Sequence, residues 1–145
     1  PGVGAFKNTV NYLKKKGIFD TIKNYSNDKP LLGICLGMQL LFENSNEFGM
    51  CEGLNLIEGN VVPLKSKVLK VPNIGWYNLK LNKKLSNTKF NFLTKNEYYF
   101  IHSYFASNVK EENLLAYYNF GEKKVPAIVK NNNIGPSGNL KVNTI

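Results

Sequence analysis

The clearest candidate for chemistry is a cysteine with a glycine two residues to each side, in the stretch GICLG at 33–37. The apolar run at 30–34 predicts a short buried strand before it, and the pattern after it predicts a helix over about 36–44. A strand that turns abruptly into a helix exposes its corner residue and strains that residue's backbone. The helix dipole would stabilise a Cys35 thiolate, and the N–H of Leu36 could hold an oxyanion.

Two interpretations of Cys35 remain open from spacing alone, because a free cysteine is also a common core residue. Gly33 and Gly37 favour the nucleophile, since small neighbours relieve the crowding at a tight corner. Cys51 lacks such neighbours and is expected to be structural or incidental. The two cysteines and the single histidine, His102, have no zinc-ligand spacing, so we expect no metal and no cofactor.

The composition fits one domain with a single core, at 145 residues and 43% hydrophobic residues. The net charge is +9, but every basic residue is lysine and the lysines are scattered. Because arginine is the preferred bidentate reader of phosphates and guanines, we expect a solvated surface and no nucleic-acid partner. No apolar run is long enough to span a membrane. With two cysteines and no sign of export, we expect a cytoplasmic protein.

The remaining elements suggest an open doubly wound α/β sheet with an added β-rich half. Residues 8–26 have helical spacing that Gly17 interrupts, and 47–55 form a glycine-broken loop. In such sheets ligands bind at the carboxyl ends of strands, which is where Cys35 falls. After Val129 we expect no strand or helix. Short β-rich segments are predicted at NVVPL (60–64), KVLKV (67–71), WYNLKL (76–81), EYYFIHSYF (97–105), LLAYYNF (114–120) and KVPAIV (124–129).

The segment GICLGMQLLF closely resembles the nucleophile motif of class I, triad-type glutamine amidotransferases. Within that family, the chain is most similar to the glutaminase subunit of imidazole glycerol phosphate synthase and its near relatives. The resemblance implies an incomplete flavodoxin-like domain over 1–134 and a divergent tail over 135–145. Further matches, in the family's order, are PGVGAF (1–6), SNEFG (45–49), GLNLIEGNV (53–61), VPNIGW (71–76) and YYFIHSYF (98–105).

The resemblance implies that L-glutamine is the substrate and that Cys35 attacks its side-chain amide. A glutamyl thioester forms, ammonia leaves, and water then releases glutamate. The N–H of Leu36 corresponds to one oxyanion donor, and a peptide of the loop Gly2-Val3-Gly4 corresponds to the other. Without the resemblance, that loop would be interpreted as a simple turn.

The resemblance also implies a set of glutamine-binding residues. Gln39 lies one helical turn after Cys35 and corresponds to the residue that grips the backbone end of glutamine. Glu47 matches a carboxylate that pairs with the substrate ammonium. Ser103 and Tyr104 match the segment whose backbone holds the substrate carboxylate. From the residues alone, Ser103 and Tyr104 would be interpreted as strand residues beside a core.

Trp76 and Tyr99 match aromatic residues that lie toward a partner subunit. In the family this partner is a (β/α)₈-barrel cyclase that forms a heterodimer with the glutaminase and receives its ammonia, in histidine biosynthesis. Two departures leave the partner open: Asn73 stands where relatives commonly have histidine, and Tyr77 where asparagine is usual. A related branch supplies ammonia to a synthase that aminates surface-polysaccharide sugars, and that alternative remains.

The family's catalytic base is a histidine oriented by a glutamate, in an F-H-P-E motif expected after NNNI at 131–134. Here the sequence continues GPSGNLKVNTI. His102 aligns with a histidine that is not catalytic in the family, so we expect a structural or interface role for it. The chain resembles the middle of a glutaminase domain, and without the base we expect little hydrolysis. A non-catalytic, partner-binding remnant is the alternative.

Overall fold

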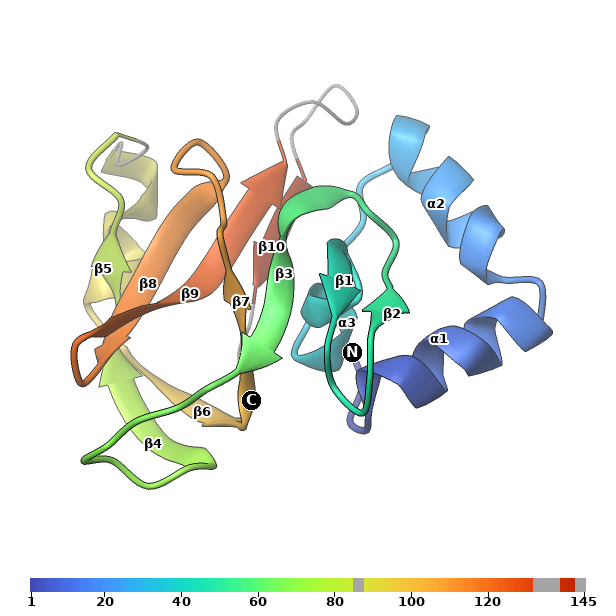
Figure 1. The fold of residues 1–145 in the computed structure, drawn as a ribbon. Helices are drawn as coiled ribbons and strands as arrows, with labels where there is room; N and C mark the ends of the chain where they lie inside the picture. Colours follow the sequence, from blue (N-terminus) through green and yellow to red (C-terminus); the bar gives the residue numbers. More distant parts are fainter. Residues whose placement is uncertain (85–87, 132–138, 143–145) are drawn as a thin grey trace.

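The computed structural model describes residues 1–84, 88–131 and 139–142 of the chain. Two N-terminal helices lie at one end of the molecule, and long antiparallel strands from the second half lie at the other (Figure 1). The cysteine corner lies between these two parts. The arrangement therefore places the candidate nucleophile where the helical and β-rich parts meet.

The two helices come from the stretch predicted to be helical. Helix α1 spans Phe6–Lys15 and helix α2 spans Phe19–Asp28. Gly17 separates them with a φ of 69°, a conformation that glycine adopts without steric cost. The predicted interruption of the helix at Gly17 is confirmed.

The corner differs from its prediction on both sides of Cys35. No strand in the described ranges pairs with residues 30–34, so the predicted buried strand is wrong there, because a strand exists only by pairing with a neighbour. The following helix, α3, spans only Leu36–Gln39 instead of the predicted 36–44.

Helix α3 ends early because later backbone groups bind its continuation. Leu54 N–H donates to the carbonyl of Leu40, and Leu56 N–H donates to the carbonyl of Leu41, both at 2.8 Å. These bonds draw the chain into strand β1, Phe42–Ser45. The helical periodicity of the sequence is therefore overridden by tertiary pairing.

The first sheet has the strand order β2-β1-β3-β7. Strand β1 pairs antiparallel with β2, Cys51–Glu52, and parallel with β3, Ile57–Pro63. Strand β3 pairs antiparallel with β7, Tyr104–Ser107. This sheet brings the Ser103–Tyr104 segment to the same region as α3.

The β-rich second half is confirmed, with a second sheet in the order β10-β9-β8-β5 and a two-stranded ribbon of β4 and β6. The register of the ribbon pairs Trp76 with Tyr99 and Asn73 with His102. Elements of this half are β4 (Asn73–Asn78), β5 (Lys80–Leu81), the 3₁₀ helix η1 (Thr88–Thr94), β6 (Glu97–His102), β8 (Leu114–Phe120), β9 (Lys123–Asn131) and β10 (Asn139–Val142).

Two predictions for this half are wrong. Residues 67–71 form bends instead of a strand, because the Ser66 hydroxyl accepts hydrogen bonds from the N–H groups of Val68 and Leu69 at 3.2 and 3.0 Å. The tail contains a strand, β10, which pairs antiparallel with β9. The open edge of β9 stabilises that strand, which local sequence does not predict. Residues 132–138 and 143–145, within the predicted tail region, lie outside the described residues.

The hydrophobic core has two clusters. One joins α1 and α3 to the first sheet, with Phe6, Met38 and Phe42 fully buried. The other lies between the second sheet and the ribbon, around Phe100 and Tyr118. Among the described residues, no helix is both long and apolar enough to cross a bilayer.

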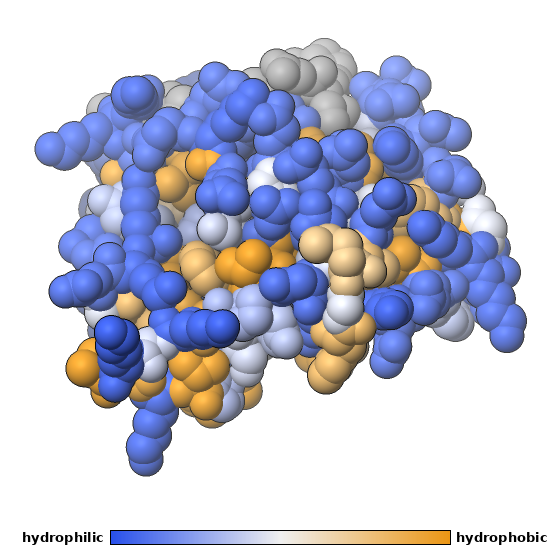
Figure 2. All heavy atoms as spheres, in the orientation of Figure 1, coloured by the Kyte–Doolittle hydropathy of each residue, from blue (hydrophilic) through white to orange (hydrophobic). Residues whose placement is uncertain are grey.

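The visible surface is mixed in polarity. Hydrophilic residues are spread over the face in view instead of gathering in one patch (Figure 2). Hydrophobic residues reach the surface low in the same view, at the end of the molecule where β4 lies (Figures 1 and 2).

Candidate active site

Cys35 occupies a strained corner. Its φ of 54° and ψ of −119° lie outside the regions that side chains other than glycine favour. A Cβ at Gly33 would lie 2.6 Å from the carbonyl oxygen of Gly37, whereas a Cβ at Gly37 would meet the Pro1 nitrogen at an ordinary 3.6 Å. The steric need predicted for both glycines therefore applies at Gly33 only.

The first turn of α3 leaves one backbone donor at the corner. Gly37 N–H donates to the carbonyl of Ile34 at 2.9 Å, and Gln39 N–H donates to the carbonyl of Cys35 at 3.1 Å. Leu36 N–H, the first of the helix, has no hydrogen bond to the described part of the chain. Among the described residues, nothing therefore competes with an oxyanion for the Leu36 N–H, the donor predicted to hold it.

A cleft of about 440 Å³ opens beside Cys35. It gathers residues from the N-terminal loop, the corner, the loop after β1, and the junction of β6 and β7. Eight of its lining residues were predicted as site residues: Val3, Gly4, Cys35, Leu36, Gln39, Glu47, Ser103 and Tyr104. Three were not predicted as site residues: Phe48, Ile101 and His102.

The N-terminal loop lies against the corner. A Cβ at Gly2 or at Gly4 would be 3.9 or 4.0 Å from Cδ2 of Leu36, so both backbones pass beside that side chain. Gly4 has a φ of 129°, a backbone conformation in which any other residue would be strained. Val3 is 93% exposed. Gly2 does not line the cleft itself, but supports Leu36 from beside it.

Gln39 and Tyr104 meet across the cleft. The Gln39 side chain donates from Nε2 to the backbone carbonyl of Tyr104 at 3.3 Å. The same carbonyl lies 2.9 Å from Nδ1 of His102. Two residues predicted to bind substrate are therefore joined, and His102 shares the Tyr104 carbonyl with Gln39.

Glu47 has a structural partner as well as a place in the cleft. Its Oε2 accepts a hydrogen bond from the N–H of Phe6 at 2.7 Å, at the start of α1. The Ser45 hydroxyl accepts one from the Glu47 N–H at 3.1 Å. The carboxylate thus binds the positive end of α1, which has no acidic residue in its own first turn.

His102 is bonded at both ring nitrogens. Nδ1 faces the Tyr104 carbonyl, and Nε2 lies 2.5 Å from the Tyr118 hydroxyl and 3.3 Å from Nδ2 of Asn73. Burial lowers the pKa of His102, and the hydrogen bond to Tyr104 opposes this in part. A neutral, fully bonded imidazole agrees with the predicted structural role.

The two departures from the family pattern are direct partners. Tyr77 donates its hydroxyl to Oδ1 of Asn73 at 2.7 Å, and Nδ2 of Asn73 donates to the Tyr118 hydroxyl at 2.8 Å. Burial raises the pKa of Tyr118. Sequence reasoning missed Tyr118, whose only signal was a polar hydroxyl within the apolar strand LLAYYNF.

Trp76 and Tyr99 lie away from the cleft, on the outer face of the ribbon. Their ring centroids are 5.5 Å apart, and Trp76 is 64% exposed. Ile74 and Ile101, paired beside them, are also exposed. The ribbon thus presents exposed apolar side chains on its outer face, whereas its inner face combines the buried Phe100 ring with the polar side chains of Asn73 and His102. Across residues 1–84, 88–131 and 139–142, no three histidine, cysteine or acidic side chains are placed to hold a metal ion.

Known proteins resemble the chain in sequence and in fold. Residues 1–136 match the family model "Glutamine amidotransferase class-I". Imidazole glycerol phosphate synthase subunit HisH of Lactococcus lactis subsp. lactis (strain IL1403) is 45% identical over 136 residues. The subunit of the same name from Bacillus licheniformis is 46% identical over 143 residues. Each match covers 92% of this chain and 65% of the relative.

The chain therefore spans 65% of the length of these relatives. A crystal structure of a glutamine amidotransferase matches with a TM-score of 0.63 and 16% sequence identity, over 96% of this chain and 65% of that one. This likeness shows the fold and confirms the predicted α/β class.

Proposed function

The chain belongs to the class-I glutamine amidotransferase family, and from this premise we propose that its cleft binds L-glutamine and that Cys35 attacks the side-chain amide. The observation that carries the proposal is the strained Cys35 backbone in the lining of the cleft, beside a Leu36 N–H that donates to none of the described residues. A strained residue directly before a helix is the feature that exposes the nucleophile in the elbow motif.

The reaction proceeds in two steps. Sγ of Cys35 bonds to the amide carbon, and the carbonyl oxygen becomes an oxyanion. The C–N bond then breaks, and the proton lost by the thiol is taken up by the leaving nitrogen, which gives ammonia and a glutamyl thioester. Water hydrolyses the thioester to glutamate and returns the thiol. The N–H of Leu36 and a peptide of loop 2–4 hold the oxyanion, since both lie at the corner.

Substrate binding uses the rest of the cleft. Glu47 binds the ammonium of glutamine, Gln39 binds its backbone end, and the backbone of Ser103 and Tyr104 binds its carboxylate. Their shared lining of one cleft supports these roles.

A base for the thiol is not among the described residues. His102 is the one histidine in the sequence, and both of its nitrogens are bonded elsewhere. General bases contribute roughly 10²–10⁴-fold to rates. We therefore expect this chain, assayed alone, to react at Cys35 but to turn glutamine over slowly.

The proposed partner is a (β/α)₈-barrel cyclase that receives the ammonia and makes imidazole glycerol phosphate in histidine biosynthesis, in the cytoplasm. The names of the relatives support this assignment, because they describe a subunit of that synthase. The outer face of the ribbon supports heterodimer formation, because an exposed Trp76 beside Tyr99 is typical of an interface.

Partner binding without catalysis is the second candidate, and one observation favours it: Trp76 and Tyr99 do not line the cleft, so binding through them does not depend on a base. The sugar-amination alternative depended on Asn73 and Tyr77. These two side chains bond to each other on the inner face of the ribbon, where they do not alter the outer face. The structure therefore offers no observation in favour of that alternative.

Alkylation by a glutamine-shaped diazoketone tests the nucleophile. We expect saturable labelling of one thiol, slowed by L-glutamine, abolished in Cys35→Ser and unchanged in Cys51→Ser. The second variant is a matched control, because Cys51 is also a half-buried free thiol. Labelling that survives in Cys35→Ser, or that L-glutamine does not slow, would contradict the proposal.

A further inference from the structure

A chain of hydrogen bonds runs from the inner face of the ribbon to the cleft. It begins at the Tyr77 hydroxyl, passes through Asn73, the Tyr118 hydroxyl and the His102 ring, and ends at the Tyr104 carbonyl. The proposed roles of the cleft residues do not account for it. Tyr118 is its least exposed aromatic member, at 1%.

The donors in this chain all point one way. The Asn73 amide donates to the Tyr118 hydroxyl, so the hydroxyl proton is available for Nε2 of His102. An imidazole that accepts at Nε2 carries its proton on Nδ1, which then donates to the Tyr104 carbonyl. The Tyr104 carbonyl, which can only accept, therefore fixes the Nδ1–H tautomer of His102. The Tyr118 hydroxyl donates to the other nitrogen, Nε2, and so fixes the orientation of the ring.

The ring of Tyr118 is itself fixed by packing. Its centroid lies 4.4 Å from that of Tyr77 and 4.4 Å from that of Phe100. Strand β8 pairs with β9 along nearly its whole length. The hydroxyl is thus presented from a rigid strand, as required of a group that orients another.

We propose that Tyr118 is a positioning residue for the cleft: through the orientation of the His102 ring it holds the Tyr104 carbonyl, and through that carbonyl it sets the Gln39 amide. The consequence for glutamine affinity rests on the proposed function. The Gln39 bond is the loosest link in the chain from Tyr118, at 3.3 Å. If the His102 ring lost its fixed orientation, the Tyr104 carbonyl would no longer be held in place, and the Gln39 side-chain amide could rotate.

The sequence makes the test unusually direct. His102 and Gln39 are its only histidine and its only glutamine, so their side-chain nitrogens give one set of NMR signals each. The test variant is Tyr118→Phe, which removes the hydroxyl and keeps the ring. Tyr117→Phe is the matched control, because Tyr117 precedes Tyr118 on the same strand and its hydroxyl has no hydrogen bond to the described residues. Asn82→Ala controls for general loss of stability.

In the unaltered chain we expect a single Nδ1–H tautomer. In Tyr118→Phe we expect a shifted Nε2 signal of His102, a shifted Gln39 amide signal, and about tenfold weaker L-glutamine binding by calorimetry, the effect of about one hydrogen bond. Tyr117→Phe and Asn82→Ala should show none of these changes. A mere packing role would alter the melting temperature and leave the Gln39 amide signal in place.

An unmoved Gln39 amide signal, or unchanged glutamine affinity, in Tyr118→Phe would overturn the proposal. Failure of the unaltered chain to bind glutamine would count against the proposed function alone. The Gln39 signal in Tyr118→Phe would still decide the positioning role in that case, because it is measured without substrate.

Discussion

Asn73 and Asn82 are both buried asparagines in the β-rich half, but their partners are of different kinds. Asn73 bonds side chains: the hydroxyls of Tyr77 and Tyr118, with His102 beside them. Asn82 bonds backbone: its Nδ2 donates to the carbonyls of Glu111 and Leu114 at 2.7 and 2.9 Å.

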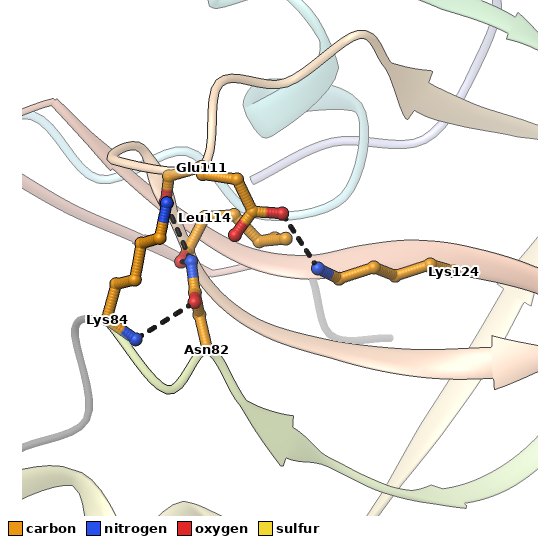
Figure 3. A network of polar contacts seen from close by, with 5 residues as sticks. All are labelled: Asn82, Lys84, Glu111, Leu114 and Lys124. Atoms are coloured by element: carbon orange, nitrogen blue, oxygen red, sulfur yellow. Dashed lines mark hydrogen bonds and ion pairs between the residues drawn. The ribbon is translucent and has the colours of Figure 1, made fainter.

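Figure 3 shows the surroundings of Asn82. Its Oδ1 accepts the Lys84 N–H at 3.2 Å, and Glu111 forms an exposed ion pair with Lys124 at 3.1 Å. The hydrogen bond from Lys124 lowers the pKa of Glu111. Every bond of the Asn82 side chain ties one stretch of backbone to another.

The difference separates two uses of a buried amide. At Asn82 the amide joins the end of β5 to the backbone at the start of β8, which is a contribution to stability. At Asn73 the amide fixes the directions of two tyrosine hydroxyls in a hydrogen-bond chain that reaches the cleft, which is a contribution to the orientation of cleft groups. Loss of Asn82 should therefore change stability without changing the cleft, whereas loss of Asn73 should change both.

The largest effect on stability is expected at Asn82. Asn82→Ala removes three hydrogen bonds and leaves two carbonyls short of a donor, so the free energy of unfolding should fall by about 2–3 kcal/mol. Urea denaturation gives this quantity, and the rate of Cys35 alkylation should not change. A slower alkylation would mean that the two regions are coupled.

A smaller loss of stability, with an added effect on the cleft, is expected at Asn73. Asn73→Ala leaves the hydroxyls of Tyr77 and Tyr118 with one partner fewer, for a loss of about 1–2 kcal/mol in urea denaturation. The Tyr118 hydroxyl should lose its fixed direction, so NMR should show a shifted Nε2 signal of His102. An unshifted Nε2 signal in this variant would remove the distinction between the two asparagines.

The pH dependence of stability should carry the signature of His102. Burial depresses its folded-state pKa below the usual 6.5, so the unfolded chain binds more protons as the pH falls below that value. The free energy of unfolding should therefore decrease from pH 7 toward pH 5. In His102→Gln that slope should flatten; an unaltered slope would assign it to other groups.

The smallest effects are expected at the outer ends of the two networks. Tyr77→Phe removes one hydrogen bond, and we expect a loss of about 0.5–1 kcal/mol. Lys124→Ala breaks an exposed ion pair, and we expect no measurable change in the urea midpoint. A larger effect for Lys124→Ala would show that the ion pair supports the Asn82 region.

The parts of the fold that were predicted correctly are those with local causes. Gly17 divides the helices because of its own backbone freedom, and the segments at 114–120 and 124–129 form strands because their residue types favour them. The failures depend on distant partners. Residues 30–34 have the right composition but no neighbouring strand among the described residues, and α3 is cut short by bonds from Leu54 and Leu56.

The candidate site shows the same division. The corner at Cys35 was predictable from GICLG, because the constraint lies within five residues. Ser103 and Tyr104 were placed by resemblance, since no local pattern sends β7 to α3. The link from Tyr118 to His102 was beyond either route, because it depends on how β8 packs beneath the ribbon.

The bond from Phe6 N–H to Glu47 has a consequence for exchange measurements. Glu47 supplies from another segment the negative charge that the first turn of α1 lacks. A cation bound to Glu47 would draw on the same carboxylate and weaken its hold on that turn. Amide protons at the start of α1 would then exchange faster with deuterated water when the cleft is filled. Their exchange rates would therefore report the fraction of molecules with an occupied cleft.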